Sequence, residues 1–297
     1  DPHAQRIETG LLNRAADRND RLQERLGHDW NMGFGSNAWA VAGSATPDGR
    51  SLMAGDGHLA LDIPGLFWQV GLDTELLGGG DTHQLGLTIP GMPYMAVGTN
   101  GKVAWSQTQL MGDITDWYRE ELTLDADGAP LSTLFQGEQE ALSSVDESFV
   151  VADIPLLDSQ GRTETWRRYT TFDGRWLADI EGDVVTADYE VQSGETVIML
   201  GGDFVVPKDI DGDGIVTALS FDYTGLDNGN MLQALDAFGH SETVQDFRQA
   251  TLGLVAYSQN FTVSDSSGQI YYTGYQAVPC REYLERAADG SWLPGSN

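Results

Sequence analysis

The chain has 297 residues, of which 45 are acidic and 16 are basic, so its formal net charge is −29. Because contacts to phosphate require clustered lysine and arginine, this charge argues against nucleic acid as a partner. Hydrophobic residues form 40% of the chain, which is enough for a large core, and no apolar stretch is long enough to span a membrane. We therefore expect a globular protein with a densely anionic surface.

The predicted elements begin with a polar helix. Leucines among alternating charges over residues 1–27 predict one helix that ends at Gly27. From residue 36 to about residue 121, short β-rich runs separated by glycine and proline predict a sheet, with strands at 66–70 and 85–89 among others.

The later part of the chain predicts strands and then helices. Residues 122–200 add strands joined by acidic loops, including one at 196–200. A strand at 218–221 is followed by helical patterns at 230–238 and 242–252, and by a hairpin that turns at 265–268. Strands followed by grouped helices, without regular alternation, are typical of an α+β protein.

Several common catalytic signatures are missing from the sequence. No serine lies in a Gly-x-Ser-x-Gly motif, no His-Glu-x-x-His helix is present, and Gly101-Lys102 lacks the flanking residues of a phosphate-binding loop. A classical serine-triad hydrolase, a zinc peptidase and a nucleotide-binding enzyme are therefore not expected.

Ser36 is a candidate nucleophile on one condition, that the chain is cut before it. The α-amine of a new N-terminus has a pKa of about 7.7–8.0, close to the pH at which a general base works best. Nucleophile and base would then belong to one residue. By residue type alone, Gly35-Ser36-Asn37 is also an ordinary turn sequence.

Two acidic segments are candidates for calcium binding. Asp209, Asp211 and Asp213 alternate ahead of a glycine, as at the start of an EF-hand loop, but the twelfth position is Ser220 instead of glutamate. A cation there would need another ligand, such as Asp222, and the alternative is a solvated acidic turn.

The second acidic segment follows a predicted strand. Asp113 and Asp116 flank Ile114-Thr115, so two carboxylates and a carbonyl oxygen could face one hard cation. By residue statistics alone, such aspartates are more often loop caps.

Five segments occur in a recognisable order. They are Gly35-Ser36-Asn37-Ala38-Trp39, Asp56-Gly57-His58-Leu59 with Ile63-Pro64, Pro90-Gly91-Met92-Pro93, Gly98-Thr99-Asn100-Gly101-Lys102-Val103-Ala104-Trp105, and the positions Asn260, Asp265, Gly268, Ile270, Gly274, Pro279 and Arg281. Together they resemble the penicillin acylase family of N-terminal nucleophile hydrolases, although Gly57 replaces the usual proline. The resemblance runs from about residue 33 to residue 281, and the interval 122–216 matches poorly.

The resemblance implies the αββα four-layer sandwich of that family, an α+β fold of which this chain would hold an incomplete portion. Residues 1–35 would be the end of the α-chain or spacer helix with its linker. Residues 36–297 would be the N-terminal part of the β-chain, with an acidic β-rich insertion at about 122–216. The partner would be the α-chain of the same precursor, in a heterodimer after processing, and the location periplasmic or secreted.

The resemblance also implies the catalytic roles. Gly35–Ser36 would be the bond cut during maturation, with Ser36 as nucleophile and its freed α-amine as base. The oxyanion donors would be the Asn260 side-chain amide and the backbone N–H of Gln109, since a tetrahedral intermediate needs preorganised donors.

Further residues would support this site by resemblance. His58 would contact the nucleophile, and Arg281 would position Asn260 and the α-amine. The acyl pocket would include three side chains, those of Leu59, Val97 and Gln107. Aliphatic residues at two of these positions leave room for a flexible acyl chain.

Calcium would be the only cofactor, in a structural role, and no organic cofactor is implied. The ligands of the family's structural calcium would match Asp113, the carbonyl of Thr115 and Asp116. The loop with Asp209, Asp211 and Asp213 would be an insertion, and a second calcium there would be peculiar to this protein.

The sequence thus predicts an amidohydrolase that acts on a small N-acyl compound, such as an acyl-homoserine lactone, a lipopeptide or a β-lactam with an amide side chain. One alternative is a non-enzymatic, calcium-stabilised, β-rich surface module. Another is an inactive, unprocessed fragment of an acylase.

Overall fold

The computed structural model describes residues 9–31, 35–59, 63–76, 78–157, 159–227, 231–255, 257–281 and 287–288. The chain divides into two compact units. Unit 1 comprises Asp1–Leu22, Thr115–Tyr223 and Cys280–Asn297, and unit 2 comprises Gln23–Ile114 and Thr224–Pro279.

Unit 2 is built on a six-stranded antiparallel sheet in the order β18-β17-β6-β5-β4-β3. The strands are β3 (Trp68–Asp73), β4 (His83–Thr88), β5 (Val97–Thr99), β6 (Val103–Gln109), β17 (Gln259–Asp265) and β18 (Ile270–Thr273). The turn between β17 and β18 lies at the predicted position. The predicted strand at 66–70 begins instead at Trp68, because its partner β4 ends opposite that residue, at Thr88.

Two helices cover one face of this sheet, α2 (Met231–His240) and α3 (Val244–Thr251), close to their predicted positions. A capping box between Thr243 and Asp246 begins α3. The rings of Phe238 and Phe247 stack at 4.0 Å, and both are fully buried. They pack with Trp105 of the sheet in one apolar cluster, so the helix–sheet interface is the core of unit 2.

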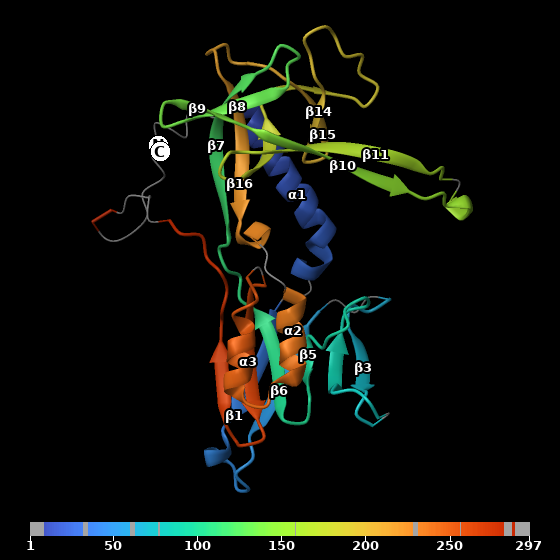
Figure 1. Ribbon diagram of the computed structural model, residues 1–297, viewed down its shortest axis with the longest axis vertical. Coiled ribbons are helices and arrows are strands. Elements are labelled where there is room, and N and C mark those ends of the chain that lie inside the picture. Colours follow the sequence, from blue (N-terminus) through green and yellow to red (C-terminus); the bar gives the residue numbers. More distant parts are fainter. Residues whose placement is uncertain are drawn as a thin grey trace. The chain divides into compact units, whose positions relative to one another are not determined.

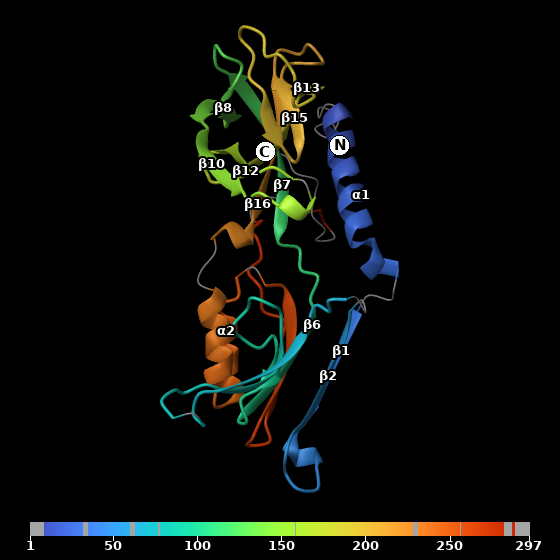
Figure 2. The ribbon, with the colours of Figure 1, turned by 90° about the vertical axis from the view of Figure 1, so that its right-hand side faces the viewer.

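A hairpin of β1 (Gly35–Val41) and β2 (Leu52–His58) lies on the other side of the sheet (Figure 2). A short 3-10 helix, η2 (Gly43–Ala45), lies in its connection. The hairpin contacts β6 and β17. Any side chain at Gly55 would overlap the Ser106 hydroxyl of β6, so only glycine permits this close approach. Unit 2 therefore has three layers, helices, sheet and hairpin, which fit part of the predicted αββα sandwich.

Unit 1 contains a seven-stranded antiparallel sheet in the order β10-β11-β12-β16-β7-β8-β9 (Figure 1). Its strands are β7 (Thr115–Leu124), β8 (Pro130–Phe135), β9 (Glu138–Ala141), β10 (Ser143–Val151), β11 (Arg162–Thr170), β12 (Trp176–Ile180) and β16 (Val216–Tyr223). Unit 1 also contains a separate three-stranded sheet, in the order β13-β15-β14. This sheet has β13 (Gly182–Val185), β14 (Ile198–Leu200) and β15 (Asp203–Pro207). Unit 1 has a short 3-10 helix, η3 (Pro155–Leu157), and unit 2 has another, η4 (Thr224–Asp227).

The first helix, α1 (Thr9–Asn31), corrects one expectation. Gly27 was predicted to end it, but the helix continues for four more residues. A glycine inside a helix costs only about 1 kcal/mol relative to alanine, which the rest of a long helix can tolerate. Residues 1–8 of the predicted helix lie outside the described residues. Within the described part of the chain, the helices are too short or too polar to cross a membrane.

Candidate active site

The predicted cleavage junction lies in a paired strand. Gly35 and Ser36 are the first two residues of β1, opposite His58 and Gly57 of β2. The Ser36 hydroxyl donates a hydrogen bond of 2.7 Å to the Gly35 carbonyl oxygen. The candidate nucleophile is therefore held against the carbonyl group of the bond that cleavage would break.

His58 stands next to this junction. A Cβ placed on Gly35 would lie 3.6 Å from the His58 Nδ1 atom. The other ring nitrogen, Nε2, lies 3.2 Å from the Asn37 side-chain nitrogen and 3.1 Å from an Asp56 carboxylate oxygen. An Nε2 atom without hydrogen can accept from Asn37, and one with hydrogen can donate to Asp56, so the neighbours suit either tautomer of the ring.

Asn260 lies in a small polar cluster near the end of β6. Its side-chain nitrogen donates to the Gln109 carbonyl oxygen at 3.1 Å and to the Thr108 hydroxyl at 3.2 Å. The Tyr272 hydroxyl donates to the side-chain oxygen of Asn260, Oδ1, at 2.6 Å. These contacts orient the amide so that its N–H groups face Thr108 and Gln109. An oxyanion at this position would have to replace one of those two acceptors.

Gly274 and Gln259 are further neighbours of this cluster. A Cβ at Gly274 would lie 3.1 Å from the Asn260 side-chain oxygen, so the glycine leaves room for the amide. The Gln259 side chain donates to the side-chain oxygen of Gln109 at 2.8 Å. Both residues predicted as oxyanion donors, Asn260 and Gln109, are thus in direct contact.

The strand register brings these groups into one unit. Gly55 of the hairpin lies against Ser106, and Gly55 pairs with Ala38, two residues after Ser36. On β6, Thr108 follows Ser106 by two residues and pairs with Asn260. Unit 2 therefore contains the nucleophile, the histidine and both oxyanion donors predicted from the sequence, on strands that contact each other.

The predicted acyl-pocket residues also belong to unit 2. Leu59 directly follows β2 and is 40% exposed, and Val97 begins β5 and is half-buried. Gln107 lies in β6, opposite Phe261, and its side-chain oxygen is buried without a hydrogen bond to any described residue. Burial raises the pKa of the nearby Tyr257, and a hydrogen bond with Gln107 opposes that rise. The role of these three residues in an acyl pocket stays a prediction.

Arg281 lies in unit 1 and binds Asp116. Its Nε atom is 2.9 and 3.0 Å from the two carboxylate oxygens, and a terminal nitrogen is 2.7 Å from one of them. Both oxygens of Asp116 thus face a guanidinium group, and this arrangement does not present the carboxylate to calcium. The predicted triplet of Asp113, Thr115 and Asp116 is also divided by the unit boundary after Ile114. The calcium and positioning roles of these residues stay predictions.

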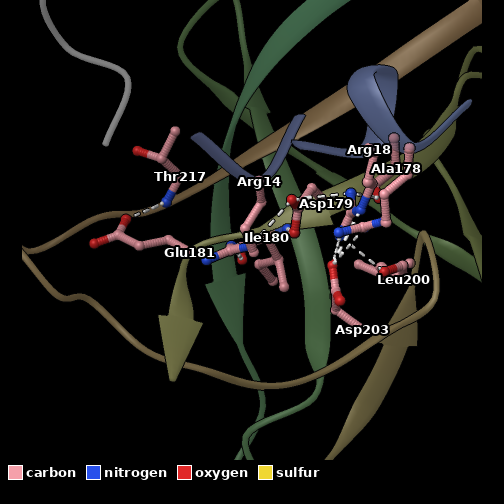
Figure 3. Close-up of polar contacts among 10 residues, drawn as sticks. Arg14, Arg18, Ala178, Asp179, Ile180, Glu181, Leu200, Asp203 and Thr217 are labelled. Atoms are coloured by element: carbon pink, nitrogen blue, oxygen red, sulfur yellow. Dashed lines mark hydrogen bonds and ion pairs between the residues drawn. The ribbon is translucent and has the colours of Figure 1, made fainter. Parts of the chain in front are cut away.

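In unit 1, two carboxylates of the acidic loop lie close to a third carboxylate that the sequence did not predict as a ligand. Carboxylate oxygens of Glu181, Asp209 and Asp211 lie within 4.8 Å of one another. Glu181 is fully buried and accepts a hydrogen bond from the Thr217 backbone N–H group (Figure 3). It also accepts one from the Ile210 backbone N–H group. Such oxygen ligands suit a hard cation. The predicted ligand Asp213 is not in the group.

The sequence identifies the candidate site residues better than it identifies the residues that contact them. Tyr272 is found by counting outward from the predicted turn at 265–268, which places it diagonal to Asn260 across the hairpin. Asp56 and Asn37 follow in the same way from the pairing of β1 with β2. Glu181 gives no comparable signal, because it lies 28 residues before the acidic loop and belongs to no motif.

Comparisons with known proteins show what this chain is similar to. The chain is 37% identical over 120 residues to the penicillin acylase 2 proenzyme of Pseudomonas sp. (strain SE83), which covers 39% of this chain and 15% of that protein. It is 34% identical over 116 residues to the acyl-homoserine lactone acylase QuiP of Pseudomonas aeruginosa, covering 39% of this chain and 13% of the relative. The chain thus matches only a small part of the length of these curated relatives.

The fold comparison extends over more of the chain. A thermostable penicillin G acylase from Alcaligenes faecalis superposes with a TM-score of 0.53 and 18% sequence identity, over 86% of this chain and 39% of that protein. This similarity confirms the predicted fold, of which the chain holds a part. The sequence model of the penicillin amidase family matches residues 3–297. As the resemblance predicted, the chain belongs to the penicillin amidase family.

Proposed function

We propose that this chain forms part of an amidohydrolase that cleaves the linear amide of a small N-acyl compound by acyl transfer to Ser36. Cleavage of the Gly35–Ser36 bond first makes Ser36 an N-terminal residue. Its α-amine, with a pKa of about 7.7–8.0, then acts as general base for its own hydroxyl. This chemistry needs no organic cofactor.

One observation carries the proposal, the hydrogen bond of 2.7 Å from the Ser36 hydroxyl to the Gly35 carbonyl oxygen. It keeps the nucleophile beside the carbonyl group that maturation must attack. His58 pairs with Gly35 across the hairpin, and we propose that its imidazole takes the hydroxyl proton during maturation. The name of one relative, a proenzyme, agrees with maturation by cleavage.

In the maturation step, Ser36 Oγ attacks the carbonyl carbon of Gly35 and the peptide C–N bond breaks. The acyl group moves to the oxygen, and the Ser36 nitrogen gains the proton that the hydroxyl loses. Water then hydrolyses the ester, which leaves a carboxylate on Gly35 and restores the Ser36 hydroxyl. The product is a serine with a free α-amine.

In turnover, the same hydroxyl attacks the amide carbonyl of the substrate, and the leaving amine takes the proton. Water hydrolyses the acyl-enzyme to a carboxylic acid. The Asn260 side-chain amide and the Gln109 backbone N–H stabilise the oxyanion in both steps. Loss of such a donor lowers kcat by about 10²–10³-fold, which is the effect we expect for Asn260→Ala.

The acyl pocket favours an aliphatic chain in this proposal. Leu59 and Val97 are aliphatic, and their flexible or branched side chains leave space that a ring would fill. The relatives named above are one acyl-homoserine lactone acylase and one penicillin acylase. We therefore place a long-chain acyl lactone ahead of a β-lactam with an aromatic side chain.

Other properties complete the proposal. The upstream cleavage product would remain as the partner chain in a heterodimer, and the protein would be periplasmic or secreted. A structural calcium ion would bind at Asp113, Thr115 and Asp116, provided that Arg281 leaves Asp116. A second calcium would bind at the acidic loop with Asp209 and Asp211.

The first test is intact-mass spectrometry of the full-length protein that contains this chain. We expect two fragments with a new N-terminus at Ser36, and a single uncut chain in Ser36→Ala. Ser44→Ala is the matched control, because Ser44 is an exposed serine in the connection of the same hairpin. Cleavage that persists at this bond in Ser36→Ala would contradict the proposal.

The second test compares substrates in the processed protein. We expect faster hydrolysis of a long-chain acyl-homoserine lactone than of a phenylacetyl amide, measured as kcat/KM. Preference for the phenylacetyl amide would overturn the aliphatic pocket and leave the amidase assignment intact. Hydrolysis of neither amide by a protein cut at Ser36 would count against the activity itself.

A further inference from the structure

One face of the sheet in unit 2 carries a row of polar side chains. In β6, Ser106 and Thr108 lie two residues apart, and their partners in β17 are Thr262 and Asn260, respectively. Side chains at every second position of a strand share a face, and so do directly paired residues. A side chain at Gly55 of the hairpin would overlap the Ser106 hydroxyl, so the row lies on the face that contacts the hairpin.

Tyr272 adds a hydroxyl to this row from β18. It pairs with Thr262, and Asn260 lies two residues before Thr262, so Tyr272 is diagonal to Asn260 on the same face. The preceding residue, Tyr271, points to the opposite face and packs against the apolar core between the sheet and the helices. Of two adjacent tyrosines, one therefore belongs to the candidate active site and the other to the core.

The Tyr272 hydroxyl holds one end of the Asn260 amide. It donates to Oδ1 at 2.6 Å, while Nδ2 at the other end donates to the Gln109 carbonyl oxygen at 3.1 Å. An amide oxygen can only accept hydrogen bonds, and an amide NH₂ group can only donate them. A flip of the amide would bring Oδ1 against the Gln109 carbonyl oxygen. Tyr272 and Gln109 together therefore select the orientation in which the N–H groups of Asn260 face Gln109.

The contact with Tyr272 differs from the others because the proposed reaction leaves it in place. An oxyanion must replace either the Thr108 hydroxyl or the Gln109 carbonyl oxygen as acceptor of the Asn260 N–H groups. The amide then loses one of the contacts that orient it. The bond from Tyr272 lies at the opposite end of the amide, at Oδ1, and does not compete with the oxyanion.

The chain directly after β18 also limits the space around Oδ1. A Cβ on Gly274 would lie 3.1 Å from Oδ1 and 3.2 Å from a side-chain carbon of Leu110. Both distances are shorter than the separation of about 3.5–4.0 Å in an ordinary van der Waals contact. The backbone therefore passes close to Oδ1, and a displacement of the amide toward Gly274 would meet it.

We propose that Tyr272 is a positioning residue for the oxyanion donor, and that its hydroxyl keeps the Asn260 N–H groups directed at the oxyanion. The inference rests on the proposed function. Tyr272 acts through Asn260 in this role and does not touch the reacting atoms. Its bond also polarises the amide, because hydrogen bonds in a chain strengthen one another. Both effects grow as charge develops on the substrate oxygen, so they favour acyl transfer more than substrate binding.

Steady-state kinetics of the processed full-length protein test this role. The substrate is a long-chain acyl-homoserine lactone or a phenylacetyl amide, whichever is hydrolysed faster. Tyr272→Phe removes only a hydroxyl from a side chain that is 64% exposed, so the variant should fold. We expect kcat to fall about fivefold to tenfold, the effect of one lost hydrogen bond, and KM to stay unchanged.

Tyr271→Phe is the matched control, because it removes a hydroxyl from the neighbouring residue on the core face. It should change neither kcat nor KM. Equal kcat in Tyr272→Phe and the wild-type protein would overturn the proposal, and so would an equal fall in both variants.

A double-mutant cycle shows whether Tyr272 acts through Asn260. In Asn260→Ala the amide is gone, so the addition of Tyr272→Phe should not lower kcat further. A second fivefold to tenfold loss in the Asn260→Ala background would mean that the two residues act independently, and it would overturn the positioning role.

A measurement on the uncut protein separates this inference from the proposed function. In Ser36→Ala, ¹⁵N NMR follows the side-chain amide of Asn260, whose signals are assigned by their loss in Asn260→Ala. We expect Tyr272→Phe to shift these signals and to speed the exchange of their hydrogens with water, and Tyr271→Phe to leave them unchanged. Signals that do not respond to Tyr272→Phe would contradict the orientation of Asn260 by Tyr272.

The two kinds of failure then differ. If the wild-type protein hydrolyses neither amide while the NMR signals respond, the proposed function fails and the orientation of Asn260 by Tyr272 is retained. If the wild-type protein hydrolyses an amide and Tyr272→Phe is equally fast, the proposed function stands and the positioning role fails.

Discussion

In unit 2 the largest fully buried side chains are aromatic, with Trp105, Phe238 and Phe247 packed between a sheet and two helices. In unit 1 some of the most buried groups are charged. Glu181 is fully buried, and Asp179 and Glu120 are nearly so. Each carboxylate is satisfied by arginine, hydroxyl or backbone N–H groups. The apolar core of unit 2 is weakened by a lost side-chain volume, whereas a buried carboxylate of unit 1 is weakened by a lost donor, so the two units should fail in different ways.

The largest effect should come from the aromatic core of unit 2. Phe238→Ala removes a fully buried ring that stacks on Phe247, and we expect a loss of about 4 kcal/mol in the free energy of unfolding. Urea denaturation measures this change. Phe149→Ala is the control, because Phe149 is 46% exposed on β10 of unit 1. Similar losses for both variants would show that unit 2 does not depend on this stack.

The next effect tests the buried charges of unit 1. Asp179→Asn removes the charge that Arg14 and Arg18 share, and we expect it to destabilise unit 1 by about 3 kcal/mol, since both guanidiniums lose this buried carboxylate. Asp183→Asn makes the same change in an exposed pair with Lys208. We expect less than about 1 kcal/mol there. Salt should weaken the exposed pair more than the buried one.

A smaller, pH-dependent effect belongs to unit 2. Burial alone would raise the pKa of Asp265, but hydrogen bonds from Ser267, Val244 and Gln269 hold it below the ordinary value of 3.8. The lowered pKa means that Asp265 stabilises the folded state above about pH 4, and that this contribution disappears as the pH falls through the folded-state pKa. In Asp265→Asn, the acid dependence of the unfolding midpoint should become shallower. An unchanged slope would remove Asp265 as its source.

The smallest effect should come from the surface of unit 2. Lys102 and Glu242 form an exposed ion pair. Glu242→Gln should change the free energy of unfolding by about 0.5 kcal/mol or less, because solvent screens the pair. A larger change, measured by the same urea denaturation, would mean that surface charge matters more in this anionic protein than its geometry indicates.

The sequence predicted unit 2 better than unit 1, for a physical reason. Helix α3 and the hairpin at 265–268 follow from local patterns, namely a capping box and a glycine turn. The resemblance placed Ser36, His58, Gln109 and Asn260, and strand pairing then brings them into one unit. Paired strands have a regular register. Once the strands and turns of unit 2 are located from local patterns, most of the contacts between them follow.

The missing part of the prediction depends on contacts between distant residues. Asp179 is 165 positions from Arg14, and Glu181 is 36 positions from Thr217. No periodicity connects these residues, and a single carboxylate in a strand reads as solvent-exposed. The ion pair between Arg281 and Asp116 also joins residues that are far apart in the sequence. The resemblance had assigned these two residues to different sites.

The pairing of β1 with β2 also determines which agent can reach the Gly35–Ser36 bond. Other proteases prefer exposed loop tips, where a segment is free to enter their cleft. This bond instead lies in a strand, with both of its residues already paired to a neighbour. In the proposed maturation, the attacking group would be the Ser36 hydroxyl, which lies next to the bond. Strand pairing would then make this bond a poor substrate for other proteases, and maturation would need no recognition sequence.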